Sequence, residues 1–149
     1  MAVLITVSCG STASALVAKF VTLVLPRLPP GTENSLSGGK AIFPTALNVL
    51  LLIPFLESLL LCGSIEVFRR FRAPFFLQLG VGAVILALTH LPWWPIAVIV
   101  APGFFFQSFL YLRWRETSWL VPLLLVTEAH SLHNLLPFLD FLIWKMHGV

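Results

Sequence analysis

Charged residues are scarce in this sequence. Nine Lys and Arg and six Asp and Glu account for 10% of its 149 residues, whereas a soluble globular domain carries roughly 25% charged residues. The chain is 58% hydrophobic, and its mean hydropathy is +0.97. This composition excludes an ordinary soluble domain. We therefore expect residues 1–149 to form a single membrane domain surrounded by the lipid bilayer.

Three further absences narrow the class. Short alternating strands are missing while long apolar runs are present, which favours spanning helices over a membrane barrel. No run of five or six like charges occurs, so membrane topology and anionic lipid headgroups explain the net charge of +3 better than nucleic acid does. No basic residue precedes Lys19. The charged start of a signal peptide is thus missing, and we expect the first apolar segment to stay in the mature protein.

Cysteine is also scarce. The two cysteines, Cys9 and Cys62, both lie inside apolar stretches. A disulfide between them could form, but buried free thiols are the better interpretation.

The apolar runs predict about five spanning helices. A helix needs about 20 apolar residues to cross the hydrocarbon layer, and runs of about this length lie at residues 3–25, 41–62, 75–91, 96–112 and 118–144. The pattern of the second run continues to Arg70, and Pro137 is a candidate break in the fifth. A turn with two tryptophans at residues 92–95 follows the third run. The predicted fold class is all-α, a polytopic transmembrane helical bundle.

Basic residues in the loops predict an orientation. Five arginines fall in the loops after the second and fourth runs, which alternation places on one side of the membrane; they are Arg69, Arg70, Arg72, Arg113 and Arg115. The other side has Arg27, Lys40 and Lys145. By the positive-inside rule, the N-terminus lies inside and the C-terminus outside.

Among the polar residues inside the apolar runs, where such groups are costly, six are candidates for function. They are Glu57, His90, Glu128, His130, His133 and Asn134. At a rise of about 1.5 Å per residue, Glu57 and His130 each lie about 20 Å from the nearest basic loop and His90 about 24 Å. Three side chains from three helices are thus expected to meet at a similar depth.

The spacing around His130 indicates which groups share a pocket. His130 and Asn134 are four residues apart and project from one helical face, with His133 close to it. Glu128 lies about 200° around the helix from His130 and should not serve the same pocket. A buried carboxylate can act as a general base, and His and Asn side chains can stabilise an oxyanion. The set is therefore suited to hydrolysis.

Two alternatives stay open at this point. Glu57, His90 and His130 would also be a suitable ligand set for zinc, with an open fourth position. Each residue has a structural interpretation as well. A histidine at the end of a segment often meets interfacial water, and an intramembrane asparagine often only bonds a neighbouring helix.

The order and spacing of these residues resemble the CPBP family of intramembrane proteases, which is related to abortive-infection proteins and includes the CAAX prenyl endopeptidases. The family motifs are E-E-x-x-x-R-G, then F-x-x-x-H, then H-x-x-x-N or D. The third motif matches fully from His130 to Asn134. The second keeps His90 and has Leu86 in place of the aromatic residue. The resemblance covers about residues 43–136.

The first motif is altered. It keeps Glu57 and Gly63, whereas Ser58 stands in place of the second Glu and Cys62 in place of the Arg. An acid and a base are thus lost together. Such a paired loss is electrostatically safer than the loss of one partner, because a lone buried charge costs several kcal/mol.

The resemblance implies hydrolysis of a peptide bond within the membrane by a glutamate-activated water, without a metal or another cofactor. Glu57 would be the general base, His90 would support it or the leaving group, and His130 with Asn134 would form the oxyanion site. It also implies a multi-pass protein of a bacterial inner or plasma membrane. Its substrate would be a membrane protein or a lipidated peptide.

A second hypothesis is a non-catalytic subunit that keeps the CPBP-like scaffold and stabilises a larger membrane protein complex. The altered first motif and the small size of the chain favour it. So do Glu128, which the pocket does not use, and the aromatic run Phe104-Phe105-Phe106, which is expected on the surface. The two hypotheses differ in whether replacing Glu57 or His90 abolishes cleavage.

Overall fold

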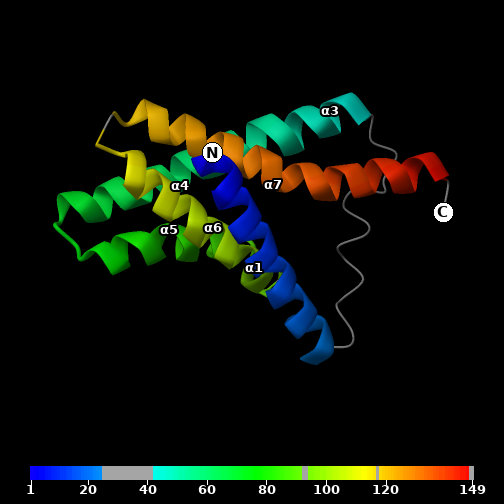
Figure 1. Cartoon of the computed structure of the whole chain (residues 1–149), viewed down its shortest axis with the longest axis horizontal. Helices are drawn as coiled ribbons and strands as arrows, with labels where there is room; N and C mark the ends of the chain where they lie inside the picture. Colours follow the sequence, from blue (N-terminus) through cyan, green and yellow to red (C-terminus); the bar gives the residue numbers. More distant parts are fainter. Residues whose placement is uncertain (25–41, 92–93, 117, 148–149) are drawn as a thin grey trace.

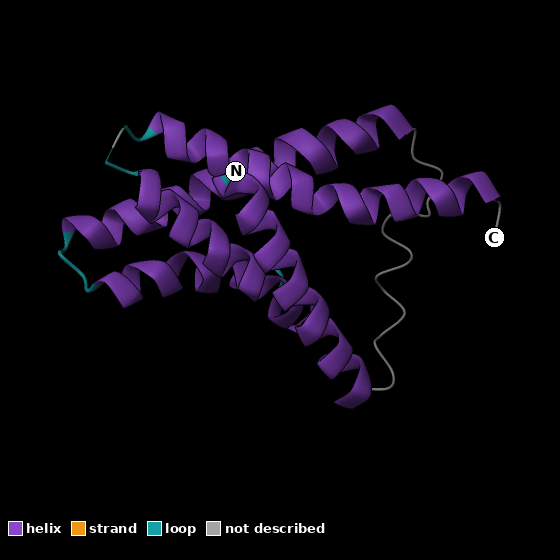
Figure 2. Ribbon diagram, viewed as in Figure 1, coloured by secondary structure: helices purple, strands orange, loops and turns teal. Residues whose placement is uncertain are grey.

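The protein is a bundle of helices (Figure 1). The computed structural model describes residues 1–24, 42–91, 94–116 and 118–147. Its elements are α1 (Ala2–Val24), α3 (Ile42–Leu47), the π-helix η1 (Asn48–Leu52), α4 (Ile53–Arg70), α5 (Phe75–Thr89), α6 (Trp94–Trp114) and α7 (Leu120–His147). Figure 2 shows no strand in these ranges. The all-helical fold class is therefore confirmed.

Within the described ranges, two stretches are long and apolar enough to cross a membrane. One is Ile42–Arg70, which joins α3, η1 and α4 into 29 residues, and the other is α6. The helix α5 has 15 residues and would reach about 22 Å, less than the roughly 30 Å of a hydrocarbon layer. Polar residues interrupt the middle of the 28-residue α7. A bundle of five spans stays a prediction.

The predicted break at Pro137 is wrong, because α7 continues as a helix from Leu120 to His147. Proline has no N–H, so the carbonyl of His133, four residues earlier, loses its helical partner. Neighbouring groups compensate for such a loss in membrane helices. The other runs lie within a few residues of their predicted bounds. Residues 92 and 93 of the predicted tryptophan turn lie outside the described residues, as do Arg27 and Lys40.

The helix α6 is the centre of the bundle and packs against α1, α4, α5 and α7 (Figure 1). A Cβ added to Gly10 of α1 would lie 3.3 Å from the Cα of Gly103 on α6, so two backbones meet where neither residue has a side chain. A Cβ added to Gly82 of α5 would lie 2.7 Å from Oγ of Ser108 on α6 and 3.0 Å from Cγ of Leu61 on α4. Glycines thus set the spacing of α6 from α1 and α5.

The turn between α4 and α5 closes α4 with a Schellman motif. The N–H of Ala73 donates to the carbonyl of Phe68, and the N–H of Arg72 donates to that of Arg69. Arg72 occupies the left-handed position of this motif with φ of 55°, where glycine is favoured. The two helices therefore form a tight hairpin with arginines at its tip.

The π-helix η1 lies immediately before α4 on the same continuous helix. A π turn inserts one extra residue and rotates the helix on either side by about 100° relative to an uninterrupted α-helix. The insertion stands five residues before Glu57, so it affects how the start of this helix faces α7.

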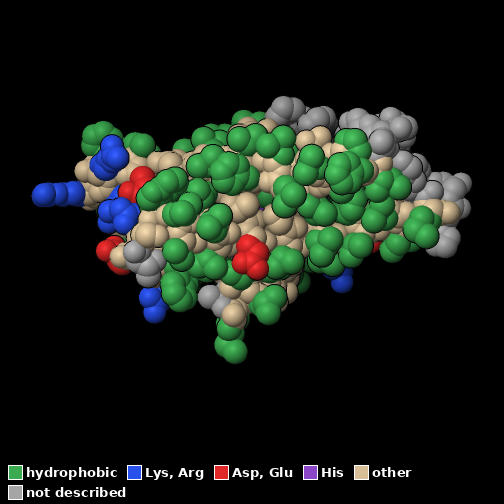
Figure 3. Space-filling view, turned by 90° about the horizontal axis from the view of Figure 1, so that it is seen from above, with side chains coloured by type: hydrophobic (Ala, Val, Ile, Leu, Met, Phe, Trp, Pro, Cys, Tyr) green, Lys and Arg blue, Asp and Glu red, His purple; other side chains and the backbone are tan. Residues whose placement is uncertain are grey.

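The outer surface is mostly apolar. Figure 3 shows hydrophobic side chains over most of one face, with most of the visible Lys and Arg gathered at one end. On α5, for example, Phe76 is 82% exposed and Val84 is 57% exposed. Large exposed apolar areas of this kind mark contact with lipid or with other proteins.

Candidate active site

A polar pocket lies between α4, α6 and α7, beside the end of α5. Its volume is about 120 Å³, which leaves room for a few water molecules. All four predicted site residues line it, together with further polar and apolar side chains. The lining consists of Ile53, Glu57, His90, Val100, Gly103, Phe104, Gln107, His130, His133 and Asn134.

The carboxylate of Glu57 contacts both predicted histidines. Its Oε2 lies 3.2 Å from Nε2 of His130, and its Oε1 lies 3.9 Å from Nε2 of His90. The side chains of Glu57 and His130 are 20% and 5% exposed, so this contact is largely buried. The three side chains that were predicted to lie at a similar membrane depth therefore line the same pocket. Their catalytic roles stay predictions.

Hydrogen bonding indicates which nitrogen of His90 carries the proton. Its Nδ1 lies 2.9 Å from the carbonyl oxygen of Leu86. Because a carbonyl only accepts, Nδ1 of His90 is the donor. Neutral His90 therefore presents a bare Nε2 towards Glu57, and this nitrogen can take up a proton.

His130 has the opposite arrangement when Glu57 is ionised. Its Nε2–H then donates to the carboxylate, which leaves Nδ1 as an acceptor. This Nδ1 is buried and has no hydrogen-bond partner in the described part of the chain. A buried acceptor without a partner is costly, so Nδ1 of His130 is an unsatisfied group beside the pocket.

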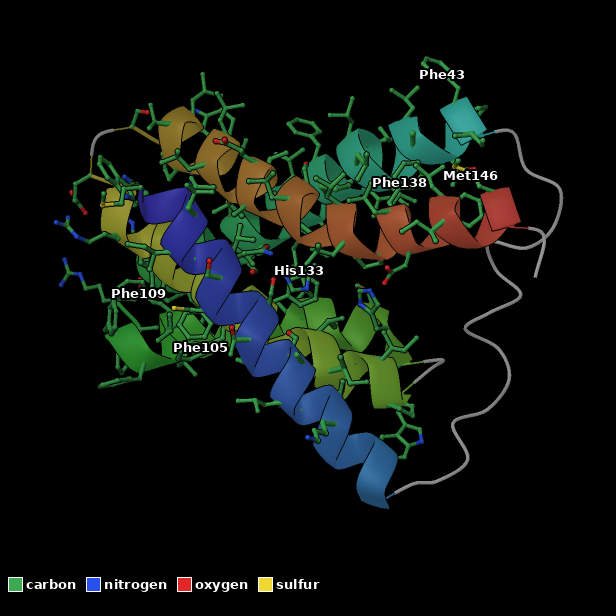
Figure 4. All side chains as sticks on the ribbon, turned by 45° about the vertical axis from the view of Figure 1, so that its right-hand side comes forward. Phe43, Phe105, Phe109, His133, Phe138 and Met146 are labelled. Atoms are coloured by element: carbon green, nitrogen blue, oxygen red, sulfur yellow. The ribbon has the colours of Figure 1, made fainter. Side chains whose placement is uncertain are left out.

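Phe104 of α6 lies against both histidine rings. Its ring centroid is 5.8 Å from that of His90 and 5.4 Å from that of His130, in an edge-to-face contact with the latter. Phe104 is 3% exposed, whereas Phe105 is 42% exposed. The prediction of a surface made by Phe104-Phe105-Phe106 is therefore wrong for Phe104, because α6 turns this residue into the pocket. Figure 4 shows Phe105 apart from His133.

Asn134 joins the pocket to the π-helix. Its Nδ2 donates to the carbonyl of Val49 in η1 at 3.0 Å. The N–H of Ile53 donates to the carbonyl of Asn48, five residues earlier. The corresponding partner of the Val49 carbonyl is Pro54, which has no N–H, so this carbonyl is available to Asn134. The carboxamide nitrogen has two hydrogens, so one fixes α7 against η1 and the other remains for the pocket.

His133, which the sequence only placed near the site, also lines the pocket. Its Nδ1 lies 3.1 Å from Oγ of Ser11 on α1, and Figure 4 shows it between α7 and α1. A Cβ added to Gly103 would lie 3.5 Å from Cε1 of His133. The helix α1 therefore contacts a lining residue from outside the pocket, which no spacing in the sequence indicated.

Gln107 is a pocket residue that the sequence pattern did not single out. It lies on α6, lines the pocket and is 3% exposed. Its Oε1 is buried and has no hydrogen-bond partner among the described residues. Gln107 sits three residues after Phe104, so both side chains project from the same face of α6. An uncharged carboxamide in an apolar run was the available signal.

The two substituted positions of the first family motif are packed inside the helices. Ser58 is 0% exposed and Cys62 is 4% exposed, and neither belongs to the described lining of the pocket. Cys62 and Cys9 are both free thiols, as predicted, but only Cys62 is buried and Cys9 is partly exposed. Serine and cysteine are small and uncharged, so they fit these buried positions, where a glutamate and an arginine would need to be paired.

The structure also bears on zinc and on Glu128. Within the described ranges, no group of three or more His, Cys, Asp or Glu side chains has an arrangement that could hold a metal ion. Glu128 is exposed on α7 and does not line the pocket. The predicted separation of Glu128 from His130 is therefore confirmed.

Comparisons of the chain with protein-family models, with curated proteins and with solved structures found no match. The likeness to the CPBP family thus depends on the motifs in this sequence.

Proposed function

We propose that this protein is an intramembrane endopeptidase of the CPBP type, built as a multi-pass helical bundle, in which Glu57 activates a water molecule. The observation that carries this proposal is the Glu57 carboxylate between Nε2 of His90 and Nε2 of His130 in a small pocket. The helix that carries Glu57 is long and apolar enough to cross a membrane. Ionisable groups at such positions are expensive and mark functional sites.

The pocket offers a base and a proton carrier. Glu57 takes a proton from a water in the cavity as the water oxygen bonds to the peptide carbonyl carbon. The bare Nε2 of His90 lies 3.9 Å from the Glu57 carboxylate. It is therefore suited to pass this proton to the leaving nitrogen as the C–N bond breaks.

The oxyanion site differs from the one that the resemblance implies. Nε2–H of His130 faces Glu57, so we assign His130 to holding the carboxylate in place. The second N–H of Asn134 and the carboxamide of Gln107 remain as donors towards the cavity. Donors fixed in a water-poor site stabilise an oxyanion strongly.

The test is a cleavage assay on the purified protein in lipid nanodiscs. Substrates are a prenylated peptide and a set of single-span membrane peptides, and mass spectrometry identifies the products. We expect Glu57→Gln and His90→Ala each to lower the cleavage rate by about 10³-fold, the scale of general acid–base catalysis. Glu128→Gln is the matched control, because it neutralises a carboxylate outside the pocket. Unchanged cleavage in both pocket variants would overturn the proposal.

One observation favours the second candidate, a non-catalytic subunit of a membrane complex. Glu128 is exposed on α7, and a carboxylate facing lipid is costly unless a partner covers it. If this function is the true one, affinity purification from native membranes will recover a stoichiometric partner. Glu128→Gln would lose that partner, whereas Glu57→Gln would keep it.

A further inference from the structure

A second groove lies at the arginine-rich end of the bundle. It is formed by α4, α6 and two residues of the connection between α6 and α7, and its volume is about 360 Å³. The lining is Leu59, Cys62, Gly63, Glu66, Arg70, Tyr111, Arg115 and Trp119. The α4 members Leu59, Gly63, Glu66 and Arg70 have the spacing of one helical face. Glu57 is about 240° around the helix from Gly63. The groove and the polar pocket therefore open on different sides of α4.

The acidic residue of the groove is fully engaged within the protein. Arg115 binds the Glu66 carboxylate through Nε and through Nη2, the latter at 3.1 Å. The Tyr111 hydroxyl donates to Oε1 of Glu66 at 3.0 Å, and Nε of Arg69 donates to Oε2 at 3.4 Å. The carboxylate charge is thus compensated, and its repulsion of an anion in the groove is weak.

Arg70 adds positive charge to this compensated cluster. It is exposed in the last turn of α4 and lines the groove. With Arg115 and Glu66, the lining has two positive charges and one negative charge. The end of the bundle where Lys and Arg gather is visible in Figure 3. Such an end attracts the anionic surface of a membrane.

The rest of the groove is apolar and extends away from Arg70 along α4. Gly63 lies about 10 Å from Arg70 along the helix axis, and Leu59 lies about 16 Å from it. A Cβ added to Gly63 would meet no atom within 4 Å, so this part of the groove is open. Trp119 is 57% exposed and stands near the arginines, where an indole ring suits the headgroup layer.

We propose that this groove binds one anionic phospholipid, with its phosphate on Arg70 and an acyl chain along Gly63 and Leu59. The distances match a molecule that is anionic at one end and apolar over the next 10–16 Å. The inference needs the protein to lie in a bilayer, and it is independent of any protease activity.

The experiment is native mass spectrometry of the whole protein released from phosphatidylcholine nanodiscs that contain a minority of phosphatidylglycerol. We expect wild type to retain phosphatidylglycerol selectively and Gly63→Trp, which fills the groove, to abolish that retention. Gly80→Trp is the matched control, because Gly80 also has no atom within 4 Å of an added Cβ and does not line the groove. Arg70→Gln should lower the affinity for phosphatidylglycerol about fivefold, since one basic residue contributes about 1 kcal/mol to anionic lipid binding.

Equal retention of the two lipids by wild type would overturn the proposal, as would equal effects of the two tryptophan variants. Displacement of the lipid by soluble glycerol phosphate would indicate a simple phosphate site instead. A copurifying protein that is lost in Gly63→Trp, with no selective lipid, would assign the groove to a partner. If Gly63→Trp unfolds at a lower temperature than wild type, Arg70→Gln alone decides the result.

Discussion

Two glutamates on α4 have opposite environments. Glu57 and Glu66 are nine residues apart, about 14 Å along the axis and half a turn around it. Glu57 meets the imidazoles of His90 and His130, which can gain or lose a proton. Glu66 meets the guanidinium of Arg115, which stays charged. The same side chain therefore suits proton transfer at one place and a fixed structural contact at the other.

The largest difference between the two glutamates is expected in the cleavage rate. Glu57→Gln should lower the cleavage rate by about 10³-fold, because the amide cannot accept the proton of water. Glu66→Gln should leave the rate within about threefold, because Glu66 does not line the pocket. The measurement is the single-turnover rate of both variants at a temperature where each is folded. Equal losses in the two variants would contradict the contrast.

For the free energy of unfolding, we expect the Glu66 variant to show the larger loss. Glu66→Gln is expected to lower the free energy of unfolding by about 1–3 kcal/mol, because Arg115 and Tyr111 lose a charged hydrogen-bond partner. Unfolding in a denaturing detergent series measures this loss. Glu116→Gln is the control at the same end of the bundle. Its side chain is 84% exposed and lies 3.6 Å from Arg69, so we expect a change below about 0.5 kcal/mol.

Asn134 tests whether one residue can both stabilise the fold and take part in catalysis. Asn134→Ala removes the hydrogen bond to Val49 and should cost about 0.6 kcal/mol, the average for such bonds between membrane helices. It should also slow cleavage by about tenfold or more if its second N–H serves the oxyanion. A stability loss with an unchanged rate would restrict Asn134 to joining α7 and η1.

A local backbone effect is expected at Arg72, at the tip of the α4–α5 hairpin. Arg72→Gly should raise the free energy of unfolding by about 1 kcal/mol, since an L-residue with a side chain is strained at positive φ. The variant Arg72→Ala separates the backbone from the charge, because it loses the guanidinium and keeps the strain. Both are compared with wild type in the same detergent series, and a gain in Arg72→Ala equal to that in Arg72→Gly would assign the effect to charge.

Much of the helix layout follows from the sequence. Four of the five apolar runs are followed by proline, glycine or arginine. Most of the run bounds lie within a few residues of the helix ends, although α4 continues past Gly63 to Arg70. Distance from the basic loops also placed Glu57, His90 and His130 at one depth. The depth of a residue in the membrane can be estimated from the sequence, because the helical rise per residue is constant.

Contacts between helices are harder to predict from the sequence. Spacing fixes which side of a helix a residue is on and leaves open which helix faces that side. The contact of Ser11 with His133 joins α1 to α7 across 122 residues, and that of Glu66 with Arg115 spans 49. The π turn at Asn48–Leu52 adds one residue to the helix. This insertion rotates the residues before it relative to those after it, so regular helical spacing does not predict which neighbours they face.

The position of α1 has a consequence for biogenesis. This helix packs chiefly against α6 and α7, which are made much later, and its Ser11 reaches a histidine of the last helix. Synthesis proceeds from the N-terminus, so α1 is made before α6 and α7. Gly10 can dock on Gly103 once α6 has been made, whereas Ser11 has no histidine partner until α7 follows. The packing of α1 can therefore be completed only after α7 has been inserted.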